Sequence, residues 1–196
     1  MKATHQLLIL SAAFMSAVSC TTITGETNTS SKVKPGVPGA EVVKTTRITA
    51  TVTGIDTTKR KVTLVTPGGE KFHVKAGPEV ANFSQIRVGD QLKATLTEEV
   101  VVRMAKPGEK IGDDASAGIG IAPLGAKPGV VTADTIQLVG TVTAIDLKKH
   151  QATLRFSDGS SKSFAVRKDV DLTKRKVGER VVIRSTEVFA ILLEKP

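Results

Sequence analysis

The chain contains no Trp and no Tyr, and it has a single Cys among its 196 residues. One Cys can form neither an internal disulfide framework nor a zinc site built from thiolates. No apolar run reaches the roughly 18 residues that an ordinary transmembrane helix requires. Hydrophobic residues nevertheless make up 40% of the sequence, which is too much for a wholly disordered chain. The sequence therefore predicts a folded protein outside the disulfide-rich, zinc-thiolate and helical membrane classes.

The first twenty residues have the pattern of an export signal. Lys2 is the only Lys, Arg, Asp or Glu before Cys20, and a predominantly apolar stretch extends from Leu7 to Val18. A short positive start, an apolar core and small residues at the end are typical of a cleaved signal peptide. We therefore expect residues 1–19 to be a signal peptide and the protein to be exported.

The segment Ala17-Val18-Ser19-Cys20 resembles the lipobox of bacterial lipoproteins, although that family prefers Leu in place of Ala17 and Gly or Ala in place of Ser19. The resemblance implies cleavage before Cys20 and lipidation of its thiol and its new amine, which together give a stable membrane anchor. Thr21 stands where an Asp retains such proteins at the inner membrane, so the resemblance implies the outer membrane, facing the periplasm, in a cell with two membranes. The alternative is an ordinary cleaved signal with a leftover Cys.

The segment that follows Cys20 is rich in Thr, Ser, Gly and Pro and shows no hydrophobic period. This composition is typical of a flexible linker. We therefore expect residues 20–40 to be a lipid-anchored flexible tether that separates the folded part from the membrane.

A duplicated segment is the main structural signal. Residues 51–64 read TVTGIDTTKRKVTL and residues 141–154 read TVTAIDLKKHQATL, with eight of the fourteen positions identical. A looser correspondence continues downstream at an offset near 90. Internal similarity at a fixed period indicates repeated structural units. We predict two copies of one unit, over residues 41–105 and 134–196.

Each copy has the alternation of β-strands. Ile48, Ala50 and Val52 alternate with Thr residues, a period of two that favours a strand. The alternation slips at Gly54-Ile55 and again at Ala144-Ile145, which indicates a β-bulge or bend. Turn residues follow, and a less regular connection with room for one helical turn precedes the last two strands.

The predicted fold class is all-β, with two tandem five-stranded OB-like small barrels joined by a Gly/Pro-rich segment. In the first copy the fourth strand contains Leu92 to Leu96 and the fifth contains Val100 to Met104. Closure into a barrel would remove unpaired strand edges. An SH3-like barrel and a single merged sandwich are the alternatives. Residues 106–133 are either a linker or a long ordered crossover, because this length exceeds ordinary loops.

Thr51 to Leu64, Phe72 to Val74 and Val88 to Asp90 resemble the strand pattern of small periplasmic OB-fold metal-binding proteins of the copper-chaperone type. That family binds metal through a His, a Met pair and a nearby Trp. This chain has no Trp, and Met104 is its one Met beyond the signal. The resemblance therefore implies the scaffold without its ligands, and the pattern is equally similar to bacterial lipoproteins with repeated small barrels. We predict no metal site and no cofactor.

Candidate catalytic groups are few. His73 and His150 do not occupy matching positions in the two copies, and a metal site needs three or four converging ligands. Asp56 and Asp146 do match, but each lies at a strand end before turn residues, where Asp usually hydrogen-bonds its own turn backbone. No nucleophile elbow and no HExxH motif occurs. The sequence therefore does not predict an enzyme.

Positive charge is the remaining signal, because the chain has a formal net charge of +9. Basic side chains gather at turns, where OB barrels often bind their ligands. They are Lys59, Arg60, Lys61, Lys148, Lys149, Lys174, Arg175 and Lys176. The expected partners are anionic lipid, an anionic envelope polymer or an acidic envelope protein. The alternative is that these turns are solvated and contact no partner.

The function predicted from these features is that of a non-catalytic, lipid-anchored envelope protein that acts as a binding or scaffolding module. One alternative is a periplasmic protein that binds a metal or small ligand on an OB scaffold. A second is a nucleic-acid-binding OB protein, which is not favoured because export removes the usual partner and few aromatic platforms exist for base stacking.

Overall fold

The computed structural model describes residues 25–78, 80–123 and 125–195, so the predicted signal peptide and Cys20 lie outside the described residues. Within these ranges the regular structure consists of strands and two one-turn 3₁₀ helices. The strands are β1 (Glu26–Lys32), β2 (Gly39–Asp56), β3 (Lys61–Val65), β4 (Lys71–Lys75), β5 (Gln91–Met104), β6 (Asp114–Ile121), β7 (Gly129–Asp146), β8 (Gln151–Arg155), β9 (Ser161–Ala165) and β10 (Arg180–Glu194). The 3₁₀ helices are η1 (Phe83–Gln85) and η2 (Leu172–Lys174). The predicted all-β class is confirmed.

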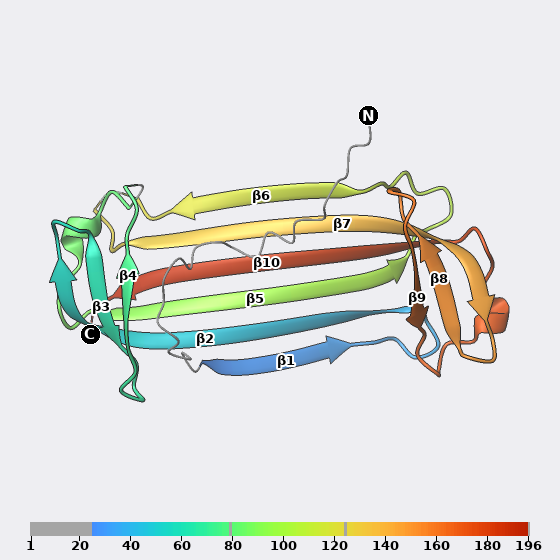
Figure 1. The fold of residues 1–196 in the computed structure, drawn as a ribbon, viewed down its shortest axis with the longest axis horizontal. Helices are drawn as coiled ribbons and strands as arrows, with labels where there is room; N and C mark the ends of the chain where they lie inside the picture. The colour runs from blue at the N-terminus through green and yellow to red at the C-terminus, as the bar shows by residue number, and fades with distance from the viewer. Residues whose placement is uncertain (1–24, 79, 124, 196) are drawn as a thin grey trace.

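All ten strands belong to one antiparallel sheet with the order β4-β3-β2-β5-β10-β7-β8-β9, while β1 pairs with β2 and β6 pairs with β7. Figure 1 shows the long strands side by side, with a short hairpin crossing each end of the sheet. We call β3, β4 and η1 the first cap, and β8, β9 and η2 the second cap. The sheet is thus an elongated platform with a cap at each end.

The two copies meet at the pairing of β5 with β10 in the middle of the sheet. Glu98 lies directly opposite Glu187 in this pair. The sequence repeat relates these same two positions, since Thr97-Glu98 corresponds to Thr186-Glu187. The strand pairing therefore has a pseudo-twofold centre at Glu98 and Glu187.

The strands do not form two separate closed barrels. The predicted fourth and fifth strands are one continuous strand, β5, and the same holds for β10 in the second copy. The residues between the expected strands, Thr97 to Glu99, include no Gly or Pro to make a turn. Each strand therefore runs on into the other half of the molecule, and the sheet stays open.

The first cap buries residues from both copies. Val52 and Leu64 are fully buried in its core, together with Phe83 of η1. Phe189, Ile191 and Leu193 of β10 pack against or within the same cluster. Because β10 belongs to the second copy, the hydrophobic core at this end depends on a strand exchanged between the halves.

Local backbone features recur in both copies. The register shifts between Val52 and Gly54 and again between Val142 and Ala144, so the predicted bulges are confirmed. Left-handed backbone conformations occur at three equivalent pairs, which are Arg60 and His150, Gly69 and Gly159, and Gly89 and Gly178. The expected helical turns are present as η1 and η2. The repeat is therefore preserved in local geometry, although the strands are exchanged.

The segment expected to be a flexible tether, residues 20–40, contains β1, which pairs with β2 along its whole length. The loop between β1 and β2 is held by Arg167 of the second copy. The Arg167 guanidinium donates hydrogen bonds to the carbonyl oxygens of Lys34 and Gly39, and the Asp169 carboxylate accepts one from the Gly36 N–H. These contacts order the loop, although its composition alone indicates a linker.

The Gly/Pro-rich segment 106–133 is also partly ordered, because it contains β6 and the beginning of β7. The loop between these strands is attached to the first cap. The Asn82 amide donates to the Ala126 carbonyl at 2.8 Å, and Lys127 forms an ion pair with the buried Asp90 at 2.6 Å. Burial opposes ionisation of Asp90, but hydrogen bonds from Lys127 and the Arg87 N–H outweigh it and hold the pKa below its ordinary value.

Candidate functional site

The structure divides the eight predicted basic residues between the two ends of the sheet. Lys59 and Arg60 lie in the turn between β2 and β3, and Lys61 begins β3. The other five belong to the second cap or its adjoining turns, at the opposite end (Figure 1). They are Lys148, Lys149, Lys174, Arg175 and Lys176. The predicted residues therefore do not form one continuous patch.

Arg60 is occupied by contacts inside the first cap. Its guanidinium donates hydrogen bonds to the carbonyl oxygens of Ala76, Gly77 and Val80, at 3.3, 2.8 and 2.8 Å. Its charged carbon also lies 4.7 Å from the centre of the Phe83 ring, a cation–π arrangement. These contacts give Arg60 a structural role in joining β3 to η1.

Several of the other predicted residues have acidic neighbours. The ammonium of Lys174 lies 3.4 Å from the Asp171 carboxylate, and Arg175 lies 3.7 Å from Glu179. Hydrogen bonds from Thr173, aided by Lys174, hold the pKa of Asp171 below its ordinary value. The positive charge around η2 is therefore partly balanced.

A basic surface is present on the outer face of the β3–β4 hairpin. Lys61 lies directly opposite Lys75, and Val65 lies opposite Lys71. Since opposed residues in an antiparallel pair project to the same side, all three lysines share one face, and all three are exposed. The alternate residues Val62, Leu64, Phe72 and Val74 belong to or pack on the core. We call Lys61, Lys71 and Lys75 the lysine face.

Of these three lysines only Lys61 is among the predicted residues, because Lys71 and Lys75 lie within a strand and not among the basic residues clustered at turns. The alternation of lysines with Phe72 and Val74 in the run KFHVK is the signal that could have found them. None of the three lysines forms an ion pair with a described residue. Two nearby acids have other partners, because the Glu70 carboxylate accepts a hydrogen bond from the Thr66 hydroxyl and the Asp56 carboxylate accepts one from the Lys59 N–H.

The corresponding face of the second cap has a different character. Gln151 lies opposite Ala165 and Arg155 lies opposite Ser161, so all three lysines of the lysine face have neutral equivalents. The one basic residue on this face is Arg155, which takes the position of Val65. The two caps therefore share a backbone design but differ in surface charge.

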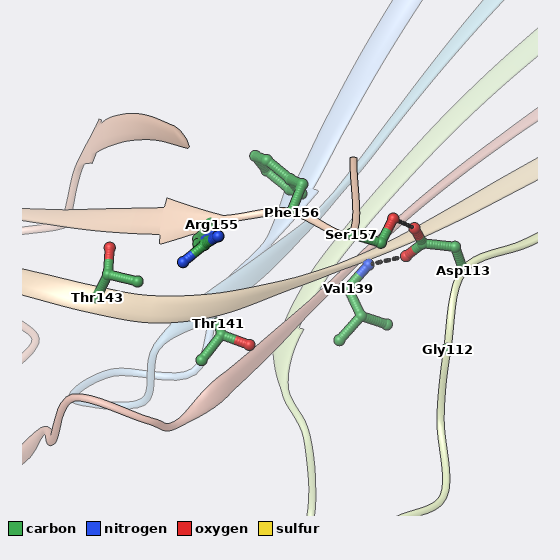
Figure 2. Close-up of a pocket in the computed structure, with 8 residues that line it drawn as sticks. All are labelled: Gly112, Asp113, Val139, Thr141, Thr143, Arg155, Phe156 and Ser157. Atoms are coloured by element: carbon green, nitrogen blue, oxygen red, sulfur yellow. Dashed lines mark hydrogen bonds between the residues drawn. The ribbon is translucent and has the colours of Figure 1, made fainter. Parts of the chain in front are cut away.

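An open groove of about 610 Å³ lies beside the second cap. Its lining residues, drawn in Figure 2, are Gly112, Asp113, Val139, Thr141, Thr143, Arg155, Phe156 and Ser157. The Arg155 side chain points between Thr141 and Thr143 (Figure 2), and it makes no hydrogen bond or ion pair with another described residue. This arrangement leaves a guanidinium available to a ligand carrying an acceptor group.

One wall of the groove is fixed by Asp113. Its carboxylate accepts hydrogen bonds from the Val139 N–H, at 2.7 Å, and from the Ser157 hydroxyl. These bonds attach the loop before β6 to β7 and to the turn after β8. Asp113 therefore has a structural role in the wall, while Arg155 is the charged lining residue that has no partner among the described residues.

The paired aspartates have the local roles that the sequence favours. The Asp56 carboxylate accepts from the Lys59 N–H, and Asp146 accepts from the N–H groups of Lys148 and Lys149. The predicted turn hydrogen bonds are confirmed. His73 is exposed on the outer face of β4, and its Nδ1 lies 3.1 Å from the Thr63 hydroxyl.

Among the described residues, no group of three or more His, Cys, Asp or Glu side chains lies close enough to hold a metal ion. The same residues include no helix with the length and hydrophobicity needed to cross a membrane. No family model and no curated protein matches the chain.

Proposed function

We propose that this protein is a non-catalytic lipoprotein of the cell envelope, anchored through Cys20, that acts as a binding or scaffolding module. In this proposal the sheet is a rigid spacer that holds the second cap away from the membrane. The observation that carries the proposal is the position at which the chain enters the sheet.

The chain enters beside the first cap. Gly25 lies against the Arg47 carbonyl and the Ile48 side chain, and Ile48 packs on the core of that cap. Cys20 precedes Gly25 by five residues, which span at most roughly 18 Å even when fully extended. A lipid on Cys20 therefore keeps the first cap close to the membrane surface.

The long strands extend from this end to the other (Figure 1). β10 has 15 residues, and at about 3.3 Å per residue it spans about 50 Å. Both β5 and β10 run without interruption through the middle of the sheet. The second cap, with its groove, is thereby presented at a distance from the anchor, as a scaffold or binding module requires.

A Cys20→Ser variant tests the anchor. We expect the wild-type protein to fractionate with membranes in high salt and to incorporate labelled fatty acid. The variant should lose the label and leave the membrane fraction, because no other acylation site of this kind exists in a chain with one Cys. Unchanged fractionation and labelling of the variant would contradict the proposal.

A second candidate function is the binding of a small ligand at the groove beside the second cap. It is favoured by Arg155, whose guanidinium faces the groove without a described partner. Arginine forms paired hydrogen bonds with planar anionic groups such as carboxylates. A carboxylate-bearing ligand would therefore suit this groove, and Arg155→Val, which restores the residue of the first copy, is the matched change for testing it.

A further inference from the structure

We propose that the lysine face of the first cap docks on anionic lipid headgroups of the membrane that holds the anchor, so that the sheet is oriented as well as tethered. This inference rests on the proposed function, because it is the Cys20 anchor that brings this end to a bilayer. It goes further by naming the surface, the contacting residues and the chemistry of the partner.

The first observation is an uncompensated pair of like charges. Lys61 and Lys75 are directly opposite each other on β3 and β4. Like charges in such a position destabilise a strand pair. Neither lysine forms an ion pair with a described residue, and Lys71 adds a third ammonium on the same face. An anionic surface would relieve this repulsion.

The second observation is the contrast with the second cap. There Gln151 and Ala165 occupy the positions of Lys61 and Lys75, and Ser161 occupies that of Lys71. The backbone design of the hairpin therefore does not require lysine at any of these positions. At these three positions, lysine occurs only in the hairpin at the end where the chain enters.

The third observation is that the inward-facing side chains of the hairpin already pack in or against the hydrophobic core. Val62 and Leu64 are in the core, and Phe72 and Val74 pack against it. The lysines therefore project away from the molecule with their ammonium groups in solvent. Each lysine close to an anionic membrane strengthens membrane binding by roughly fivefold. Three such lysines together therefore strengthen it by on the order of a hundredfold. A polybasic surface next to a lipid anchor is the combination that gives stable and oriented attachment.

The test is lysine acylation of the full-length lipidated protein, reconstituted in two kinds of vesicle and read by mass spectrometry. One kind contains phosphatidylcholine alone, and the other contains phosphatidylcholine with phosphatidylglycerol. We expect Lys61, Lys71 and Lys75 to react several-fold more slowly on the anionic vesicles, and high salt to remove the difference. Lys148, Lys149 and Lys162, at the other end, are the internal controls and should react equally on both.

Equal reactivity of the lysine face on both vesicles, with the protein still floating with them, would overturn the docking surface while leaving the anchor intact. Equal protection of lysines at both ends would also overturn it, since the molecule would then lie without a preferred end at the membrane.

If the protein fails to float in high salt, the anchor is wrong. In that case docking is still tested by flotation in low salt, which should require phosphatidylglycerol and weaken on the order of a hundredfold in Lys61→Gln/Lys71→Gln/Lys75→Gln. The matched variant Lys148→Gln/Lys149→Gln/Lys162→Gln should bind as the unaltered chain does, and equal loss in both variants would count against the lysine face.

Discussion

A half-chain comprising residues 25–105 is expected to form a dimer rather than a folded monomer. In the full chain, β5 pairs with β10 from the second copy, and Leu193 of β10 is buried in the core of the first cap. The half-chain lacks β10, so the backbone N–H and C=O groups along one edge of β5 are unpaired and the core of the first cap loses the β10 side chains that pack on it. Since β10 is the repeat equivalent of β5, a second half-chain can supply the missing strand through a true twofold axis at Glu98.

Light scattering after size-exclusion chromatography measures this directly. We expect twice the mass of the half-chain at high concentration, with dissociation and loss of strand signal in circular dichroism on dilution. The control is the full chain, which should stay monomeric over the same concentrations because its own β10 pairs with β5. A half-chain that stays monomeric with a complete β-sheet spectrum would show that each copy folds by itself.

Leu64→Ala should lower the free energy of unfolding by about 2–5 kcal/mol. Leu64 is fully buried, and it packs in the cluster that includes Val52, Leu92 and Leu193. Removing most of its side chain leaves a cavity among residues from both copies, so the whole sheet should lose stability together. Denaturant unfolding followed by circular dichroism checks the magnitude and whether a single transition remains.

Leu147→Ala is the matched control for this change. Leu147 is 56% exposed in the turn between β7 and β8, so its truncation should alter the unfolding free energy by less than about 0.5 kcal/mol. A Leu64→Ala protein as stable as the wild type would contradict the assignment of this residue to the core. Two separated transitions would contradict the exchange of strands between the caps.

The features that could be predicted from the sequence are the local ones. Alternation predicts β2 over Ile48 to Val52, and the phase slip at Gly54 predicts the bulge that the register shows. The Gly-containing turn at Gly69 and the helical turn at η1 also follow from residues close together in the chain. Each of these depends on interactions within a few residues, and a pattern in one sequence contains that information.

The features that could not be predicted depend on distant partners. The alternation in residues 91–104 fits two short strands with a turn near Thr97 as well as it fits one strand that continues to Met104. The pairing with β10 decides between these two arrangements. β1 is polar throughout, and its loop is held by Arg167, which is more than a hundred residues away. At the site, Lys61 is predicted from the sequence, and the alternation in KFHVK contains the signal for Lys71 as well. Arg155, by contrast, requires the strand register that places it beside a groove.

The exchange of strands through the middle of the sheet determines the length of the platform, the mixed core of the first cap and the distance between the two ends. If β5 is one straight strand, Lys93 and Val101 are eight residues apart along it, which corresponds to about 27 Å. If the chain instead turns back near Glu98, these positions lie on adjacent strands, within about 10 Å of each other.

Pulsed electron paramagnetic resonance on spin labels at Lys93→Cys and Val101→Cys, in a Cys20→Ser background, distinguishes these arrangements. The strand-exchanged sheet predicts a single distribution centred near 27 Å, after allowance for the label arms. A distribution centred near 10 Å would mean that each copy closes on itself, and the continuous sheet would be wrong.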